Sequence, residues 1–564
     1  MNGLTMMVIA IVVLGGAYLT YGKYLVKKWG IDPKAKTPAY EMEDGVDYVP
    51  ADTGVVFGHQ FASIAGAGPI NGPIQAAIFG WVPVLLWILI GGVFFGAVQD
   101  FAAMYASVKN KGRTIGYIIE LYIGKVGKRL FLLFTWLFSI LVVAAFADVV
   151  AKTFNGFSEE GTQIEASGAV AMTSVMFIIA AVGLGMLLKY CKLNKWINTM
   201  IAIGMLVLCV VIGLGCPIYF TTGFWHIFVF IYIAIASIVP VWALLQPRDY
   251  LNSFLLIAMI GAAVIGVLLF NPQMNLKAFN GWKVDGNLMF PYLFVTIACG
   301  AVSGFHALVS SGTASKQIKN EKDILPVSFG AMLLECMLAV IALIAVGYLA
   351  VDGNAPTGMT QPQVFASAVA TFLTKLSIPE NISSTLITLS VSAFALTSLD
   401  SVARVGRIAF QEFFLDSSIK DEKMSPFLKV MTSKYFSTGI TLMFAYALAK
   451  VGYASIWPLF GSANQLLSAL ALIACAVFLK KTNRQGFMLW GPMVIMLGVT
   501  LTALAMTIYS KVNALITATS KSVPGDLLQL SFAIALIILG VIVAIQGFQK
   551  LVEGKNKKTS NAEA

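Results

Sequence analysis

The chain has 564 residues, of which 58% are hydrophobic and only 12% are charged. Soluble proteins carry about half apolar and a quarter charged residues, so this composition predicts a polytopic membrane protein. The net charge of +11 does not indicate nucleic-acid binding, because the basic residues form short clusters between apolar runs, as in cytoplasmic loops. The six cysteines lack zinc-binding spacing, and we interpret them as packing residues.

Runs of about twenty apolar residues are long enough to cross a bilayer, and they predict about fifteen transmembrane helices. The first run lacks the basic start and the cleavage site of a signal peptide, so we expect it to be retained. The short apolar segment 362–376 is expected to lie in the outer interface or to re-enter the membrane. The predicted spans cover residues 4–26, 54–80, 81–108, 129–153, 167–189, 196–215, 225–246, 249–270, 288–311, 324–350, 383–404, 434–450, 455–479, 487–510 and 527–549.

Lysine and arginine are concentrated in alternate loops, which by the positive-inside rule face the cytoplasm. The N-terminus is then outside and the C-terminus inside. The longest polar loops are too short to form a soluble core of their own. The basic segments are 27–36, 109–128, 189–195, 248, 316–322, 407–434, 480–484 and 555–558.

The run G-H-Q-F-A-S-I-A-G-A-G-P-I-N-G-P, residues 58–73, places glycine and proline inside a predicted span. Proline removes a helical hydrogen bond and glycine loosens the backbone, so the helix should unwind there. Unwound backbone inside a membrane survives only when it is buried in protein or faces a wet cavity. We therefore favour a substrate or ion site, with a proline kink for close helix packing as the alternative.

A second polar, glycine-rich run, C-G-A-V-S-G-F-H-A-L-V-S-S-G-T-A-S-K, covers residues 299–316. His59 begins the first such segment and His306 lies within the second, and each is followed four residues later by a serine, Ser63 and Ser310. The loop charges predict that the two segments run in opposite directions, which is typical of inverted-repeat transporters. The histidines either titrate or donate to carbonyls freed by the breaks.

Several ionisable residues fall inside predicted spans. Glu335 lies near the centre of its span, where a charged carboxylate is costly. Desolvation favours the protonated acid and hence a proton-carrying role, although a neutral structural acid fits equally well. Gln99 and Asp100 are interpreted as anchors at the cytoplasmic end of their helix, and Asp148 as an anchor at an outer end.

The span 383–404 carries Thr397, Asp400, Ser401 and Arg404 on one helical face. A carboxylate and two hydroxyls would suit a hard cation or a proton. The alternative is that Asp400 simply pairs with Arg404 at the cytoplasmic end.

Asn464 and Gln465 follow Pro458 and Gly461, so the span 455–479 is a further candidate for an interruption. Interhelical hydrogen bonding is the alternative for this amide pair.

The motifs of other classes are missing from the sequence. It contains no phosphate-binding loop and no metal-ligand cluster, so we expect neither an enzyme nor a primary pump. A channel would use a ring of identical filters from several subunits, whereas two opposed broken helices suit alternating access.

Seven motifs in order along residues 54–479 resemble the carbon starvation protein A family: F-G-H-Q-F-A-S-I-A-G-A-G-P-I-N-G-P, G-A-V-Q-D-F, P-V-W-A-L-L-Q-P-R-D-Y-L, G-F-H-A-L-V-S-S-G-T, G-A-M-L-L-E, L-T-S-L-D-S-V-A-R and W-P-L-F-G-S-A-N-Q-L. That family comprises bacterial inner-membrane transporters associated with peptide uptake during carbon starvation and with pyruvate uptake by cation symport. The resemblance implies the leucine-transporter-like fold of the amino acid, polyamine and organocation superfamily, with two inverted five-helix units. The chain departs from that pattern, because its second predicted break comes seven spans after the first rather than five.

By this resemblance, the first break corresponds to the first core helix, the region 303–312 to its inverted partner, and the span holding Thr397 to the eighth helix. Sodium-coupled members of the superfamily hold the ion with hydroxyls of the eighth helix and carbonyls of the first. The implied sodium ligands here are Ala62, Ala65, Thr397 and Ser398.

We therefore predict an all-α polytopic membrane protein without a cofactor, driven by H⁺ or Na⁺ symport. Its expected activity is import of a small carboxylate-bearing nutrient, a peptide or pyruvate, across the bacterial inner membrane. An exporter is the alternative within transport, and a nutrient sensor without net transport is the alternative from a different class. The expected partners are the small-molecule substrate and the lipid bilayer, without nucleic acid, and the oligomeric state stays open.

The predicted parts are a first helix with a cytoplasmic loop (1–53), a transporter core (54–480) with repeats at 54–270 and 288–480, and two C-terminal helices with a basic tail (481–564). The candidate substrate-binding residues are His59, Ser63, Gly66, Gly68, Asn71, His306, Ser310, Ser311, Asn464 and Gln465. The candidate ion- or proton-coupling residues are Ala62, Ala65, Glu335, Thr397, Ser398, Asp400 and Ser401.

Overall fold

The computed structural model describes residues 2–44, 48–158, 160–191, 194–239, 244–415, 425–484, 486–517, 519 and 522–553. Within these ranges, eleven helical stretches are long and apolar enough to cross a membrane. Apart from loops and one two-stranded antiparallel hairpin, the described residues form helices. The prediction of a mainly helical, multi-pass membrane protein is confirmed.

The elements follow one another in chain order, with η1, η3 and η7 as π-helical turns and the other η segments as 3₁₀ turns. The first half contains α1 (Gly3–Ala17), η1 (Tyr18–Gly22), α2 (Lys23–Trp29), α3 (Pro38–Glu41), α4 (Thr53–Ile64), α5 (Gly68–Ala76), η2 (Ala77–Phe79), α6 (Trp81–Leu86), η3 (Trp87–Gly96), α7 (Ala97–Lys109), α8 (Ile115–Tyr122), α9 (Lys125–Thr153), α10 (Glu165–Tyr190), α11 (Lys195–Gly215), α12 (Thr222–Ile238) and α13 (Leu245–Phe270). The second half contains β1 (Lys283–Val284), β2 (Asn287–Leu288), α14 (Met289–Thr296), α15 (Gly304–Gly312), η5 (Ala314–Lys316), η6 (Glu321–Asp323), η7 (Leu325–Gly330), α16 (Ala331–Leu349), α17 (Gln361–Leu373), η8 (Thr374–Leu376), α18 (Glu380–Phe414), α19 (Pro426–Met431), α20 (Lys434–Ala449), α21 (Tyr453–Lys481), α22 (Phe487–Ile516) and α23 (Val523–Val552).

Four of the predicted spans form shorter helices than the eleven long stretches. Two of them are α12 and α20, and the other two are the interrupted pairs α4–α5 and α14–α15. The predicted total of about fifteen spans, the inverted-repeat relationship and the division into three parts therefore stay predictions. The segment 362–376 forms most of α17 and η8, and α17 packs against α16 and α18.

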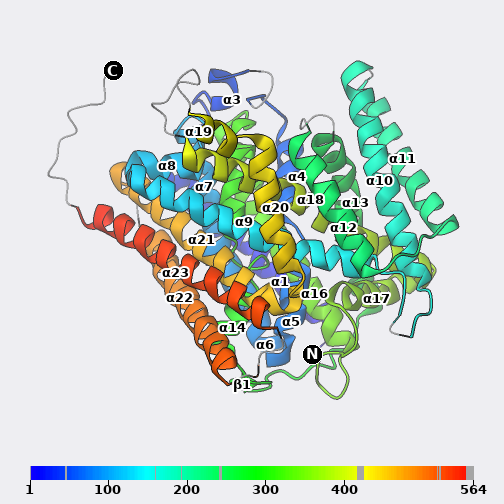
Figure 1. The fold of residues 1–564 in the computed structure, drawn as a ribbon. Helices are drawn as coiled ribbons and strands as arrows, with labels where there is room; N and C mark the ends of the chain where they lie inside the picture. The colour runs from blue at the N-terminus through cyan, green and yellow to red at the C-terminus, as the bar shows by residue number, and fades with distance from the viewer. Residues whose placement is uncertain are drawn as a thin grey trace.

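Loops predicted to share a side of the membrane do lie at the same end of the bundle. Figure 1 shows α3 and α19 at one end, and the N-terminus and the β1–β2 hairpin at the other. Which end faces the cytoplasm stays a prediction. Parts of the basic segments lie outside the described residues, namely Lys192, Lys420, Lys423 and the tail from residue 554.

Helix α21 lies at the core of the bundle. Its most apolar window is 100% buried, against 17% for Trp196–Gly215 in α11, which lies at the edge with α10 in Figure 1. The predicted interruption of the span 455–479 is wrong, because α21 continues unbroken through Pro458. The hydroxyl of Ser462 donates to the Pro458 carbonyl at 2.6 Å, a bond of the kind that lets membrane helices tolerate proline.

Candidate functional site

Both predicted glycine-rich segments are interrupted, but the first break is narrower than predicted, because Gly68, Pro69, Gly72 and Pro73 lie within helix α5. The first segment is helical as α4 and α5 with residues 65–67 between them, and the second as α14 and α15 with residues 297–303 between them. In the first break, the amide of Gly66 donates to the carbonyl of Ile64 at 2.8 Å. The carbonyl of Ala62 therefore no longer receives the Gly66 amide, its usual donor in an α-helix.

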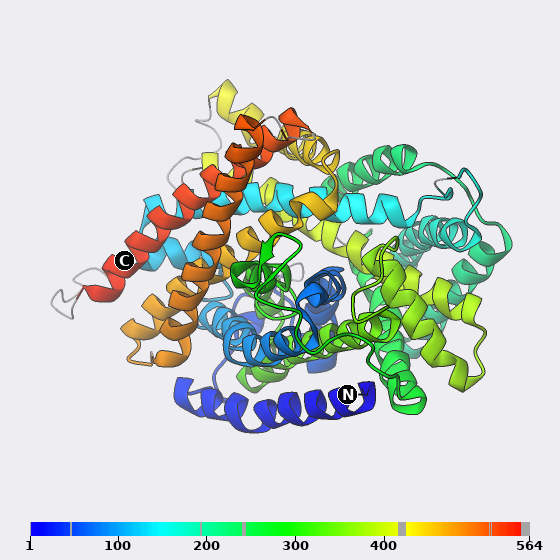
Figure 2. The same ribbon diagram turned by 90° about the horizontal axis from the view of Figure 1, so that it is seen from below.

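The two interrupted segments run side by side in opposite directions, as predicted. Helix α4 contacts α15, and α5 contacts α14. Near one end, Gln60 Nε2 donates to Ser310 Oγ at 2.8 Å. Near the other, a Cβ added to Gly72 would lie 2.6 Å from the carbonyl oxygen of Thr296, so only glycine allows this approach. Figure 2 shows α5 in blue beside α14 in green at the middle of the bundle.

A buried cavity lies where the two interruptions meet α9, α18 and α21. It leaves room for about one water molecule. Both α5 and α15 begin at the interruptions, so their partly positive N-terminal ends lie in this region. The cavity wall contains the apolar residues Ile64, Phe138, Val142, Phe146, Phe305, Val402 and Phe460, together with Gly66, Cys299, Ser398 and Asn464.

Ser398 and Thr397 face different surroundings. A Cβ added to Gly66 would lie 2.6 Å from Ser398 Oγ, and this hydroxyl is buried with no hydrogen-bond partner among the described residues. The hydroxyl of Thr397 instead donates to the carbonyl of Ala393 at 2.8 Å and accepts from the amide of Asn252. Of the two hydroxyls that the resemblance assigns to sodium, only that of Ser398 is directed at the first break.

Asn464 and Gln465 bind the second interrupted segment. Asn464 Oδ1 accepts from the amide of Phe305 at 3.1 Å, and Asn464 Nδ2 donates to Ser303 Oγ at 3.0 Å. Gln465 Nε2 donates to the carbonyl of Phe294 at 2.6 Å. Interhelical hydrogen bonding, the alternative for this pair, is thus what the structure contains. Asn464 satisfies an otherwise unpaired donor in the first turn of α15.

Replacing Asn464 with alanine is expected to destabilise the protein by roughly 1–3 kcal/mol, because the Phe305 amide and the Ser303 hydroxyl lose their buried partner. Thermal unfolding in detergent measures this loss. Asn513→Ala, at an exposed position of α22, is the control and should leave the unfolding temperature unchanged. Equal unfolding temperatures for Asn464→Ala and the wild type would contradict the assigned capping role.

Three ionisable side chains meet beside the second break. His306 Nδ1 lies 2.9 Å from Asp100 Oδ2, and His306 Nε2 lies 3.2 Å from Glu335 Oε2. All three side chains are 0% exposed. The interpretation of Gln99 and Asp100 as helix-end anchors is wrong, because Gln99 also turns inward and donates to the carbonyl of Ser303 at 2.6 Å.

Asp400 pairs with an arginine that the sequence did not point to. It forms an ion pair with Arg248 and accepts a hydrogen bond of 2.7 Å from the hydroxyl of Tyr232. Arg248 also lies 3.1 Å from Asp249. The alternative pairing with Arg404 is wrong, since that side chain donates to two carbonyls at the end of α12. Arg248 already neutralises Asp400, which weakens the hypothesis of a cation site there.

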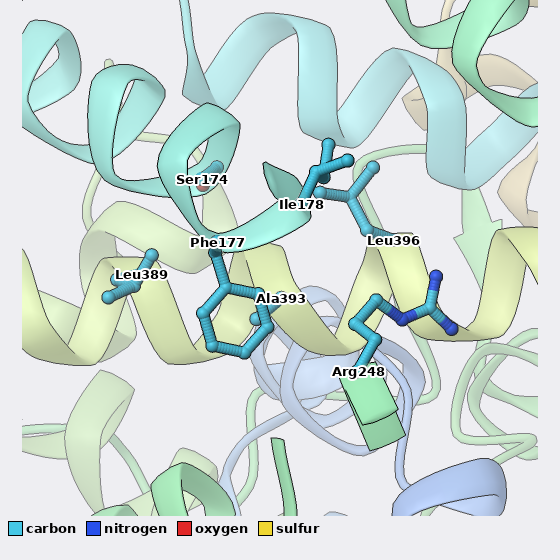
Figure 3. Close-up of a pocket in the computed structure, with 7 residues that line it drawn as sticks. All are labelled: Ser174, Phe177, Ile178, Arg248, Leu389, Ala393 and Leu396. Carbon is cyan, nitrogen blue, oxygen red and sulfur yellow. The ribbon is translucent and has the colours of Figure 1, made fainter. Parts of the chain in front are cut away.

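A second small cavity lies beside Arg248, between α10 and α18 (Figure 3). Its lining is mostly apolar, and the guanidinium is already bound to Asp400 and Asp249. The cavity between the two breaks is therefore the better candidate for substrate. The second cavity is lined by Ser174, Phe177, Ile178, Arg248, Leu389, Ala393 and Leu396.

The other predicted residues lie along the interrupted segments, α18 and α21, outside the wall of the first cavity. His59 Nε2 is 3.2 Å from Thr313 Oγ1, and Ser311 Oγ accepts from the amide of Ile115 at 3.1 Å. The side-chain amide of buried Asn71 has no hydrogen-bond partner among the described residues. This group also contains Ser63, Gly68, His306, Ser310 and Gln465, with Ala62 and Ala65 at the first break and Ser401 partly exposed on α18.

Sequence reasoning missed the aromatic wall of the cavity, including Phe138, Phe146 and Phe460. Apolar residues facing a cavity look the same in sequence as those facing lipid or another helix, so no signal in one sequence separates them. It also missed Arg248, although an arginine next to an apolar span was a usable signal.

Known proteins resemble this chain in sequence. A family model described as "Carbon starvation protein CstA" matches residues 2–362 and 354–503. The peptide transporter CstA of Bacillus subtilis (strain 168) is 32% identical, over 87% of this chain and 87% of its own length. The pyruvate/proton symporter BtsT of Escherichia coli (strain K12) is 31% identical, over 83% of this chain and 76% of its own. A manganese transporter of Eremococcus coleocola, solved with an aromatic bis-isothiourea-substituted compound, aligns over 90% and 99% of the two chains at a TM-score of 0.49 and 12% identity, which is too distant to support a conclusion.

Proposed function

Because the chain belongs to the carbon starvation protein CstA family, we propose that it is a secondary active transporter of a small carboxylate-bearing nutrient, pyruvate or a peptide. The observation that carries this proposal is the pair of antiparallel interrupted helices around a buried cavity, the arrangement that alternating-access transporters place around their substrate. Relatives named peptide transporter and pyruvate/proton symporter support both substrate classes. The proposed location is the bacterial inner membrane, with the N-terminus outside and the C-terminus in the cytoplasm.

The two half-helices that begin at the breaks suit a carboxylate. Their first turns carry backbone N–H groups without intrahelical acceptors and the positive ends of the helix dipoles. Ser398 and Asn464 add polar groups to the cavity wall, while Phe146 and Phe305 supply apolar surface for a methyl group or a peptide side chain. The same proposal includes the other predicted substrate-binding residues, which lie along the two interrupted segments and, for Gln465, on α21.

In this proposal the small buried cavity belongs to an occluded state of the transporter. Room for about one water molecule is less than pyruvate needs, so binding requires the cavity to widen. The backbone at residues 65–67 and 297–303 lies outside the helices, and such non-helical segments are natural hinges for that movement.

The coupling ion is proposed to be a proton or sodium. A sodium ion would use the hydroxyl of Ser398 and carbonyls of the first break at Ala62 and Ala65. Thr397 is the weaker ligand of the predicted set, since its hydroxyl is engaged within and beside α18. A proton would use Glu335, which is fully buried beside His306.

Uptake into liposomes tests the proposed function. Purified protein is reconstituted and supplied with labelled pyruvate or a labelled dipeptide, under proton and sodium gradients imposed separately. We expect one substrate to accumulate above its external concentration under one gradient, and the accumulation to collapse when an ionophore removes that gradient. Protein-free liposomes are the control. If a folded protein binds a substrate but accumulates none, the sensor alternative replaces the transporter.

A further inference from the structure

The side chain of His306 is held between two carboxylates from two other helices. Asp100 of α7 and Glu335 of α16 approach opposite nitrogens of the imidazole, which belongs to the first turn of α15. The three side chains therefore do not converge on one point. Among the described residues, no group of three or more His, Cys, Asp or Glu is arranged to hold a metal ion. The arrangement suits a proton, which both nitrogens and both carboxyl groups can carry.

The cluster carries a net negative charge unless it binds an additional proton. Two carboxylates and an imidazolium sum to one negative charge, and every ion pair found for either acid in the described residues involves His306. Among the described residues, the other titratable groups that face the cluster are the thiols of Cys299 and Cys336. An unbalanced charge is strongly unfavourable in a fully buried site, and binding one proton makes the cluster neutral.

Glu335 is the place for that proton. Asp100 is held by a hydrogen-bonded contact of 2.9 Å with His306, and the side chain of Gln99 lies 3.4 Å from its other oxygen. The carboxyl group of Glu335 lies within ion-pair distance of His306, but it accepts no well-aligned hydrogen bond from the described residues. Of the two acids, Glu335 is thus less stabilised as a carboxylate.

The same cluster is connected to both interrupted helices. His306 follows Phe305, which lines the cavity between the breaks, so a substrate that shifts Phe305 also shifts the imidazole. Glu335 belongs to α16, which packs against α5 of the first interrupted segment. A movement of α15 relative to α16 would therefore change the contact between His306 and Glu335.

From this geometry we propose that Asp100, His306 and Glu335 form the proton-coupling site, and that one proton carried by Glu335, beside His306, moves with each substrate molecule. The inference rests on the proposed transport function and selects the proton over sodium. When α15 moves on opening, water reaches Glu335 and the proton exchanges with that side of the membrane. Asp100 keeps the imidazole oriented through its contact with Nδ1.

The test is Glu335→Gln, which mimics the permanently protonated acid. We expect this variant to exchange internal for external substrate within about threefold of the wild-type rate, but to lose accumulation driven by a proton gradient. A pH indicator trapped inside the liposomes should record a fall in internal pH during uptake by the wild type. It should record no such fall with the variant. Asp148→Asn is the matched control: Asp148 is another buried acid beside a histidine, with His226 at 2.9 Å, and this variant should keep proton coupling.

Three results would overturn the inference while leaving transport intact. The first is accumulation by Glu335→Gln under a proton gradient, and the second is sodium-driven uptake by the wild type without proton movement. The third is loss of proton coupling in Asp148→Asn but not in Glu335→Gln. Failure of the wild type to move any substrate would instead reject the proposed function. If Glu335→Gln does not fold, the test uses Glu335→Asp instead. The measurement is then the number of protons that the purified protein takes up or releases when substrate binds. We expect the number of bound protons to change when substrate binds to the wild type or to Glu335→Asp. No change in either protein would overturn the proposal.

Discussion

Asp400→Asn is expected to lower the free energy of unfolding by roughly 3–5 kcal/mol and to abolish uptake. The substitution removes the carboxylate that neutralises Arg248, and a buried charge left without its partner is strongly destabilising. Both side chains are almost fully buried, at 0% and 1% exposure. The remaining acid, Asp249, contacts Arg248 at 3.1 Å and compensates only in part. Thermal unfolding and uptake normalised to the amount of protein in the membrane measure the two effects.

The paired variant Arg248→Gln with Asp400→Asn is the control for this prediction. It removes both charges, so it should recover much of the stability lost in the single variant, because two neutral side chains replace an ion pair without leaving a charge behind. Arg404→Gln probes a different arginine, which binds backbone carbonyls and no acid among the described side chains. Wild-type stability and uptake in Asp400→Asn would contradict the assigned role of this ion pair.

Gly461→Ala is expected to reduce uptake at least about tenfold, equivalent to about 1.4 kcal/mol. A Cβ at this position of α21 would lie 2.0 Å from the carbonyl oxygen of Val295 near the end of α14. Backbone cannot rotate away as a side chain can, so α21 and the interrupted segment must separate. Overpacking of this kind costs typically 1–3 kcal/mol, and it falls beside the second break.

Gly498→Ala is the matched control for the packing prediction. Gly498 lies in membrane helix α22, and an added Cβ there meets nothing within 4 Å. Alanine is the better helix former by up to about 1 kcal/mol, so this variant should be neutral or slightly stabilising. Equal uptake by the two glycine variants would show that close contact between α21 and α14 is not required.

Local signals allowed much of the fold to be predicted from the sequence. Apolar runs located the membrane helices. Glycine with proline located the first interruption and a polar, glycine-rich run located the second, because unwinding depends on neighbouring residues. The opposite directions of the two interrupted segments followed from loop charges, and the contacts of α4 with α15 and of α5 with α14 agree. Proline alone was a weaker signal, since α21 remains helical through Pro458.

Partners on different helices could not be predicted in the same way. The alternative that paired Asp400 with Arg404, one turn away, is wrong, because Asp400 pairs with Arg248 of α13. Nothing in one sequence connects His306 with Asp100, because only the folded bundle brings α15 against α7. Side chains choose partners by geometry between helices, whereas spacing along the chain reports only neighbours on the same helix.

A structure determined with saturating pyruvate or dipeptide would locate the bound molecule and so test the proposed substrate site most directly. We expect substrate density between the two interruptions, bounded by Gly66, Ser398 and Phe305, in a cavity wider than that of the present structure. Density in the second cavity, beside Arg248 and Phe177, with both interruptions unmoved, would contradict it.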